Sequence, residues 1–98
     1  MQNLHNLSEI TNKIAVLKFE ATWCGPCKQL TKTVASLETE YPELEFWAID
    51  IDDCPELAKQ FQVKKIPTLV IVKGGVEQER VIGSSLITPL RKLLDKYR

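Results

Sequence analysis

The sequence predicts an α/β domain in which a central mixed β-sheet is flanked by helices. Three observations carry this prediction. A short apolar strand pattern changes to helical spacing near residue 24, a second strand and helix follow between residues 44 and 61, and the last third contains a hairpin and an amphipathic helix. With 98 residues, 44% of them hydrophobic, the chain is expected to form one domain, residues 1–98.

The first strand-turn-helix unit is expected over residues 14–41. Residues 14–20 are rich in bulky apolar side chains, as in a strand. The apolar residues that follow recur at helical spacing, and Pro42 ends their pattern; they are Cys27, Leu30, Val34, Leu37 and Tyr41. The strand therefore leads through a cysteine-containing turn into a helix.

A second strand is expected over residues 44–51, which contain a nearly unbroken apolar run typical of a strand buried on both faces. Cys54-Pro55 predicts the start of the next helix, because proline suits the first helical position. Residues 1–13 carry the weakest pattern. We expect there a short edge strand and one helical turn around residues 7–11.

The last third predicts a hairpin and a closing helix. Residues 68–73 form an apolar strand pattern, Gly74-Gly75 is a turn signal, and residues 76–82 are more charged, as suits a sheet edge. The apolar residues beyond residue 86 share one helical face, which predicts an amphipathic helix starting near Thr88-Pro89.

Charge and hydropathy exclude several classes of partner. Thirteen basic and thirteen acidic residues give zero formal net charge, so no overall field attracts nucleic acid or an anionic membrane. The N-terminus lacks the pattern of a signal peptide, and no apolar run is long enough to cross a bilayer. We therefore expect a cytoplasmic monomer whose partners are proteins.

The spacing of Cys24 and Cys27 is used in proteins for metal binding or for redox chemistry. A structural zinc site needs four ligands, and only Cys54 and His5 remain, so no metal is expected. A redox pair needs one thiolate exposed at a helix N-terminus, where the helix dipole lowers its pKa, and a second thiol within disulfide reach. The predicted turn and helix supply that arrangement.

Helix spacing distinguishes the two sulfurs. With Pro26 in the first turn, Cys24 lies beside the N-cap and off the apolar stripe, so we expect it to be the attacking thiol. Cys27 lies on the stripe that faces the core and is the expected resolving thiol. A Cys24 thiolate attacks a client disulfide, and Cys27 then attacks Cys24 to release the reduced client.

The run Trp23-Cys24-Gly25-Pro26-Cys27-Lys28 matches the active-site motif of the thioredoxin family residue for residue. Ile66-Pro67-Thr68 resembles the family's cis-proline segment, and Gly83 falls where the family has a glycine. The resemblance covers residues 14–98 and implies a thioredoxin fold with a shortened N-terminus. It also implies a protein-disulfide reductase of cell redox homeostasis and electron transport. Such a protein needs no cofactor and is recharged by an NADPH-dependent thioredoxin reductase.

The resemblance also implies roles for residues around the dithiol. Gly25-Pro26 implies a reductant rather than an oxidant. A cis proline at residue 67 would pack against the dithiol and leave the preceding backbone free to pair with a client, whereas the alternative is a proline that opens an edge strand. Trp23 is expected to be a contact platform, the alternative being a core residue. The expected client-binding residues are Trp23, Ile66, Pro67, Thr68 and Gly83.

Two residues before the motif depart from the family pattern. Lys18 stands where thioredoxins carry a buried aspartate thought to take the proton of the resolving cysteine, and Glu20 replaces a tryptophan. Strand alternation puts both on one face, so an ion pair is expected. Our hypothesis is that Glu20, or a water it orders, accepts the proton while Lys18 favours the thiolate. In the alternative, Lys18 reaches solvent and Glu20 is a surface residue.

Other interpretations stay open. Cys54 is either a small structural residue at a helix start or a regulatory thiol. The chain could be a thioredoxin-like binding or scaffold module whose dithiol is dispensable. An oxidant or isomerase is disfavoured by Gly25-Pro26 but is reopened by the changes at Lys18 and Glu20.

Overall fold

A computed structural model describes residues 1–98 and contains one five-stranded mixed sheet with the order β1-β3-β2-β4-β5. β2 pairs in parallel with β3 and antiparallel with β4, which confirms the predicted α/β class. The strands are β1 (Gln2–Asn3), β2 (Ile14–Glu20), β3 (Glu45–Asp50), β4 (Thr68–Lys73) and β5 (Val76–Ile82). The helices are η1, a 3-10 turn (Leu7–Glu9), α1 (Gly25–Glu40), α2 (Pro55–Gln60) and α3 (Ile87–Asp95).

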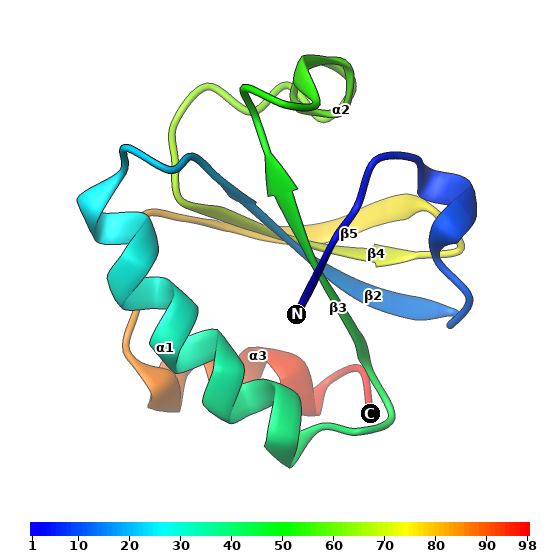
Figure 1. Ribbon diagram of the computed structural model, residues 1–98. Helices are drawn as coiled ribbons and strands as arrows, with labels where there is room; N and C mark the ends of the chain where they lie inside the picture. The colour runs from blue at the N-terminus through cyan, green and yellow to red at the C-terminus, as the bar shows by residue number, and fades with distance from the viewer.

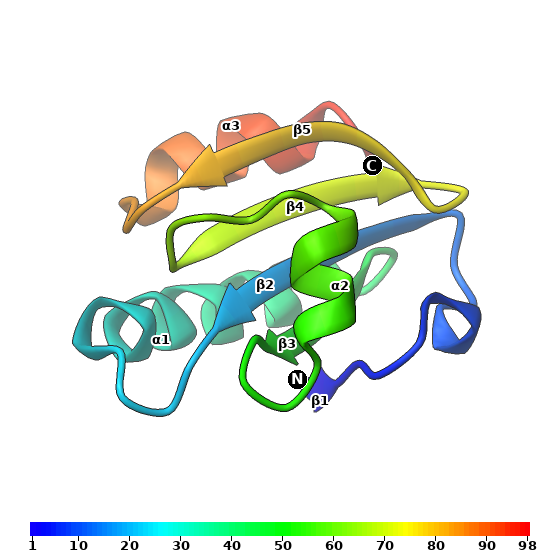
Figure 2. The same cartoon turned by 90° about the horizontal axis from the view of Figure 1, so that it is seen from above.

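Helices cover both faces of the sheet. α1 and α3 lie on one face and α2 on the other, as Figures 1 and 2 show. Successive side chains of β2 point to opposite faces of the sheet, so Val16 packs with α1 and α3 whereas Leu17 packs with α2. Burial on both faces explains why the central strands are largely apolar.

The element boundaries follow local signals. Cys24 is the N-cap of α1, and the helix stops at Glu40, directly before Tyr41-Pro42. α3 begins at Ile87, one residue before the predicted start. The expected turn at residues 7–11 is shorter, over Leu7–Glu9. No helix combines the length and apolar character needed to cross a bilayer.

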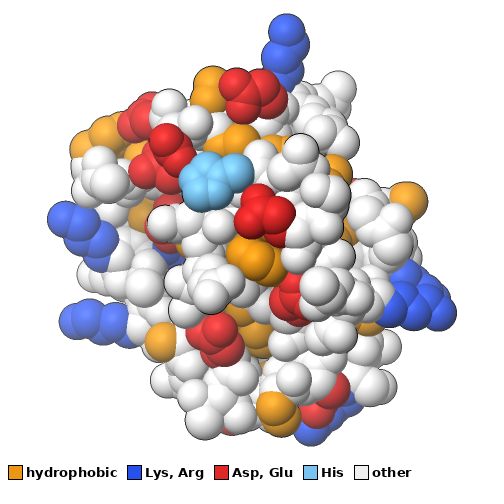
Figure 3. Space-filling model, turned by 45° about the vertical axis from the view of Figure 1, so that its right-hand side comes forward, with side chains coloured by type: hydrophobic (Ala, Val, Ile, Leu, Met, Phe, Trp, Pro, Cys, Tyr) orange, Lys and Arg blue, Asp and Glu red, His pale blue; other side chains and the backbone are white.

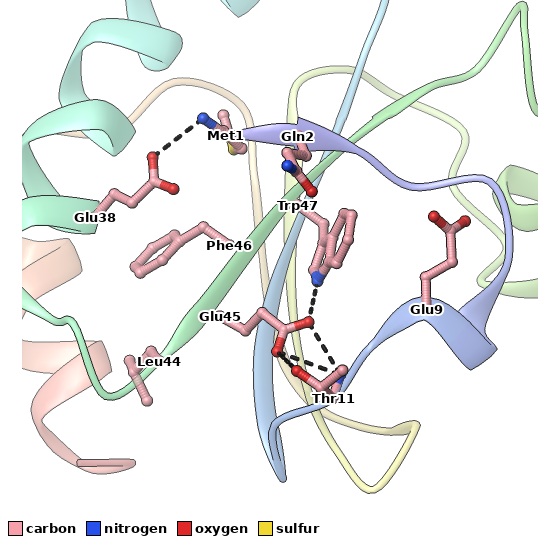
Figure 4. Close-up of a pocket in the computed structure, with 9 residues that line it drawn as sticks. All are labelled: Met1, Gln2, Glu9, Thr11, Glu38, Leu44, Glu45, Phe46 and Trp47. Carbon is pink, nitrogen blue, oxygen red and sulfur yellow. Dashed lines mark hydrogen bonds and ion pairs between the residues drawn. The ribbon is translucent and has the colours of Figure 1, made fainter.

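The largest surface hollow lies where β1, η1 and β3 meet, and no residue of the cysteine motif lines it (Figure 4). Its carboxylates are already paired. Glu45 accepts hydrogen bonds from the backbone N–H and hydroxyl of Thr11 and from Nε1 of Trp47, while Glu38 lies 3.3 Å from the amino group of Met1. Glu45 therefore ties the N-terminal segment to β3.

Candidate redox site

Cys24 and Cys27 form a disulfide at the N-terminus of α1, with their Cα atoms 5.3 Å apart. The Sγ atom of Cys24, the N-cap, accepts the backbone N–H of Cys27 at 3.2 Å. Unpaired N–H groups and the positive end of the helix dipole stabilise negative charge at such a position. The pair can therefore store two electrons as a dithiol and form a stabilised thiolate at Cys24.

Burial of the two sulfurs differs less than helix spacing predicts. The prediction that Cys27 is shielded is confirmed, because the residue is 2% exposed. The prediction that Cys24 is exposed is wrong for the disulfide form, in which it is 5% exposed. Cys24 packs with Ala21 and Cys27 in a small cluster against Ile51 and Ile66, and these contacts come from distant loops.

The Ile66-Pro67 peptide bond is cis, as the resemblance implies. The carbonyl of Pro67 accepts the N–H of Gly83 at 2.7 Å, and Gly83 has φ of +89°, a left-handed conformation that favours glycine. The hydroxyl of Thr68 is used within the fold, since it donates to the carbonyl of Lys65 at 2.5 Å. The backbone N–H and C=O of Ile66 take part in no hydrogen bond, so free backbone groups lie beside the disulfide.

Trp23 is 67% exposed, which excludes the core alternative. Its indole Nε1 donates a hydrogen bond to Oδ2 of Asp52 at 2.8 Å. Asp52 lies in the loop after β3, so a distant segment holds the ring next to the cysteine motif. The arrangement offers an apolar surface in a fixed orientation.

Lys18 is fully buried and forms the expected ion pair with Glu20. Its Nζ donates to Oε1 of Glu20 and, at 2.8 Å, to Oγ1 of Thr31. The alternative in which Lys18 reaches solvent is wrong, because Glu20 and Thr31 bind its ammonium group inside the protein. The Glu20 side chain is 26% exposed and is therefore the partner in contact with water.

Thr31 is a residue of the site that the sequence did not reveal. Its hydroxyl accepts from Lys18 and donates to the backbone carbonyl of Cys27 at 2.9 Å. The four-residue spacing from Cys27 is a weak signal, since Ser36 and Thr39 make similar local bonds in the same helix. The lysine contact depends on packing between β2 and α1.

Cys54 lies apart from the disulfide as a buried free thiol at the N-cap of α2. Its Sγ donates to the carbonyl of His5 at 3.4 Å, which fits a structural role. The face in Figure 3 shows acidic side chains around His5, whose Nε2 lies 3.0 Å from Oδ2 of Asp53. The structure contains no cluster of three or more His, Cys, Asp or Glu side chains placed to hold a metal ion.

A disulfide between two cysteines lies at a helix N-terminus beside a cis-proline, and the residue before that proline has free backbone hydrogen-bonding groups. This arrangement defines a thiol-disulfide oxidoreductase. A comparison with protein families narrows this class. The thioredoxin family matches residues 2–96, and the chain belongs to it. The match includes β1 and η1, so the resemblance to the family extends further toward the N-terminus than the expected residues 14–98.

Known relatives and structures agree with the assignment. Thioredoxin H2 of Arabidopsis thaliana is 38% identical over 88 residues, which are 90% of this chain and 65% of that protein, so the chain spans just under two thirds of it. A thioredoxin of Chlamydia trachomatis is 39% identical over 91% of this chain and 87% of its own length. The oxidised mitochondrial thioredoxin 3 of Saccharomyces cerevisiae is 35% identical and superposes with a TM-score of 0.88 over 98% of this chain and 94% of that one.

These relationships establish thioredoxin-type disulfide reductase activity and do not favour the scaffold alternative.

Proposed function

We propose that Cys24 is the attacking thiol and Cys27 the resolving thiol of a general protein-disulfide reductase. The N–H of Cys27, which lies 3.2 Å from Sγ of Cys24 at the start of α1, is the observation that carries this proposal. A Cys24 thiolate attacks a client sulfur, and the other client sulfur leaves as a thiolate. The Cys27 thiolate then attacks Sγ of Cys24, re-forms the disulfide and expels the second client thiolate.

Clients dock, in this proposal, on Trp23, Ile66, Pro67, Thr68 and Gly83. The free N–H and C=O of Ile66 support pairing with an extended client segment by strand addition. Pro67 and Gly83 shape this segment through their mutual hydrogen bond, and Trp23 adds an exposed apolar contact. Thr68 contributes by fixing the backbone, because its hydroxyl is bonded internally.

Four further residues tune the dithiol. Gly25 and Pro26 favour a reductant by resemblance to the family motif. Glu20 takes the proton of Cys27, directly or through a water, and Lys18 favours the thiolate by its charge. The bonds from Lys18 to Glu20 and to Thr31, which itself bonds the Cys27 carbonyl, support this assignment.

The remaining parts of the proposal concern the cell. The protein acts as a cytoplasmic monomer in electron transport and redox homeostasis, and an NADPH-dependent thioredoxin reductase recharges it. Family membership supports the reductase partner, and zero net charge supports protein clients rather than nucleic acid or membrane. Fractionation of cells and sedimentation of the purified protein test location and oligomeric state.

Reduction of insulin disulfides tests the central assignment. Cys24→Ser is expected to abolish activity, Cys27→Ser to accumulate covalent mixed disulfides with clients, and Cys54→Ser to retain activity as the matched control. Activity that survives Cys24→Ser would contradict the proposal. A reduction potential well above that of the cytosolic glutathione pool would instead indicate an oxidant or isomerase.

A further inference from the structure

We propose that Thr31 is a positioning residue that couples the buried Lys18–Glu20 ion pair to the resolving cysteine. The inference rests on the resolving role proposed above for Cys27. Thr31 has contacts on both sides, since its hydroxyl bonds Nζ of Lys18 at 2.8 Å and the carbonyl of Cys27 at 2.9 Å.

The chemistry of the groups fixes the direction of both hydrogen bonds. An ammonium group has donors only, so the Thr31 oxygen accepts from Lys18. The Thr31 hydroxyl hydrogen is then free to point at the carbonyl of Cys27. Two bonds oriented in the same direction polarise each other, and they extend the positive field of Lys18 toward the Cys27 peptide.

A purely local role for Thr31 does not account for this arrangement. Thr39 makes the same bond to the carbonyl four residues earlier, at 3.3 Å, without any bond to a charged group. Thr31 is exposed at the surface of α1, yet its hydroxyl is one of two hydrogen-bond partners of a fully buried ammonium. Loss of the hydroxyl would leave Lys18 with Glu20 alone.

The surroundings of Lys18 make its position important for resolution. Its neighbours in the sheet, Ala48 on β3 and Leu69 on β4, are uncharged. Glu20 is the carboxylate bonded to the ammonium. In this proposal the same cation, linked to the Cys27 backbone through Thr31, also acts on a Cys27 thiolate. The cation stabilises that thiolate only while it is held under the first turns of α1, and the Thr31 hydroxyl is the group on α1 that holds it there.

The other charged groups near the Lys18–Glu20 pair either have hydrogen-bond partners of their own or face solvent. Asp50 lies opposite Glu20 in register on β3, and its Oδ1 already accepts the backbone N–H groups of Asp52 and Asp53. On α1, Lys28 and Lys32 are exposed to solvent. The pH dependence of resolution is therefore expected to follow the Cys27 thiol and the position of Lys18.

Thr31→Val removes the hydroxyl while nearly keeping the side-chain shape. It is expected to slow the resolving step at neutral pH by about 3- to 10-fold and to move its pH profile upward by about half to one pH unit. Thr31→Ser should restore the wild-type profile, because it restores the hydroxyl. Thr39→Val, the matched control with the same local bond, should leave the profile unchanged.

Single-turnover kinetics with a thionitrobenzoate disulfide separate the two steps. In a Cys54→Ser background, attack by Cys24 releases a first thionitrobenzoate, and attack by Cys27 on the mixed disulfide releases the second. The second phase is recorded over a pH series for wild type and each variant, with thermal unfolding as a check of folding. Thr31→Ala serves as a second variant if Thr31→Val does not fold.

The outcomes distinguish this inference from the proposed function. An unshifted second phase in Thr31→Val, no rescue by Thr31→Ser, or an equal shift in Thr39→Val would overturn the role of Thr31 while the first phase and insulin reduction stay intact. Release of fewer than two thionitrobenzoates per wild-type molecule would overturn the attack and resolving roles themselves.

Discussion

Trp23 and Asp52 are joined by a 2.8 Å hydrogen bond that ties the exposed indole beside the disulfide to the loop after β3. With 67% of the residue exposed, this bond rather than burial orients the ring. An aromatic surface that is already oriented loses less conformational entropy when a partner binds. If Trp23 contacts clients as proposed above, the bond bears on their recognition more than on the sulfur chemistry.

Replacing Asp52 with alanine is expected to weaken client recognition. Loss of one hydrogen bond, worth about 0.5–1.5 kcal/mol, should raise the KM for insulin by about 2- to 10-fold with little change in kcat. Reduction of a small disulfide should be unaffected, because it does not need the indole surface. Asp53→Ala is the control, since Asp53 pairs with His5 instead. A KM unchanged in Asp52→Ala would show that orientation of the ring is unimportant.

Stability should respond unequally to loss of either member of the Lys18–Glu20 pair. Glu20→Leu leaves a fully buried ammonium without its counterion and is expected to cost about 3–5 kcal/mol. Lys18→Met leaves a carboxylate that is 26% exposed and can hydrate, so about 1–3 kcal/mol is expected. Urea unfolding of both variants and of the double variant checks the order, and a smaller loss in Glu20→Leu than in Lys18→Met contradicts it.

Acid should selectively remove the contribution of Glu45. Burial acts to raise the pKa of Glu45, but hydrogen bonds from Thr11, Trp47 and Asn12 together lower the pKa below its ordinary value of 4.5. A lowered folded pKa means that the stabilisation is present at neutral pH and is lost as the pH falls below about 4.5. Glu45→Gln is therefore expected to be about 1–3 kcal/mol less stable at neutral pH, with the difference shrinking in acid.

Thermal or urea unfolding over a pH series measures this effect. Glu43→Gln is the matched control, because the Glu43 side chain makes a surface pair with Arg98. A Glu45→Gln difference that persists unchanged in acid would show that the carboxylate charge is not the cause.

Cys54 should resist thiol reagents in the folded protein. Burial raises the pKa of the Cys54 thiol, and the neighbouring Glu56 and Asp53 act in the same direction, against a backbone N–H from Leu57 that lowers it. A raised pKa leaves little thiolate at neutral pH. Labelling of the oxidised protein is expected to be slow until urea exposes one thiol, whereas the reduced protein should react quickly at Cys24. Rapid labelling of the folded, oxidised protein would favour a regulatory thiol.

Local patterns in the sequence were sufficient for most of the fold. The helical spacing from Cys27 to Tyr41 and the apolar run at residues 46–49 each depend on neighbouring positions, so α1 and β3 could be predicted. The Gly74-Gly75 signal likewise predicted the β4–β5 hairpin. The cis bond before Pro67 came from family resemblance, because trans is the default for any such bond.

The parts of the site that were missed depend on contacts between distant segments. Burial of Cys24 requires Ile66 to pack against it, and the bond from Trp23 to Asp52 joins residues from two loops. Thr31 meets Lys18 only after α1 docks on β2. Neither periodicity nor spacing predicts these contacts, because each depends on how distant segments pack in the folded protein.

The two outer strands have a consequence for self-association. β1 is two residues long, and the outer strand β5 carries consecutive exposed or half-exposed polar residues at Glu77, Gln78, Glu79 and Arg80. Short or charged edges discourage one sheet from extending into another, which protects a chain with a strongly apolar centre from aggregation. In the docking mode proposed above, a client segment would then pair with the free backbone of Ile66, which packs against the two cysteines, rather than with an edge of the sheet.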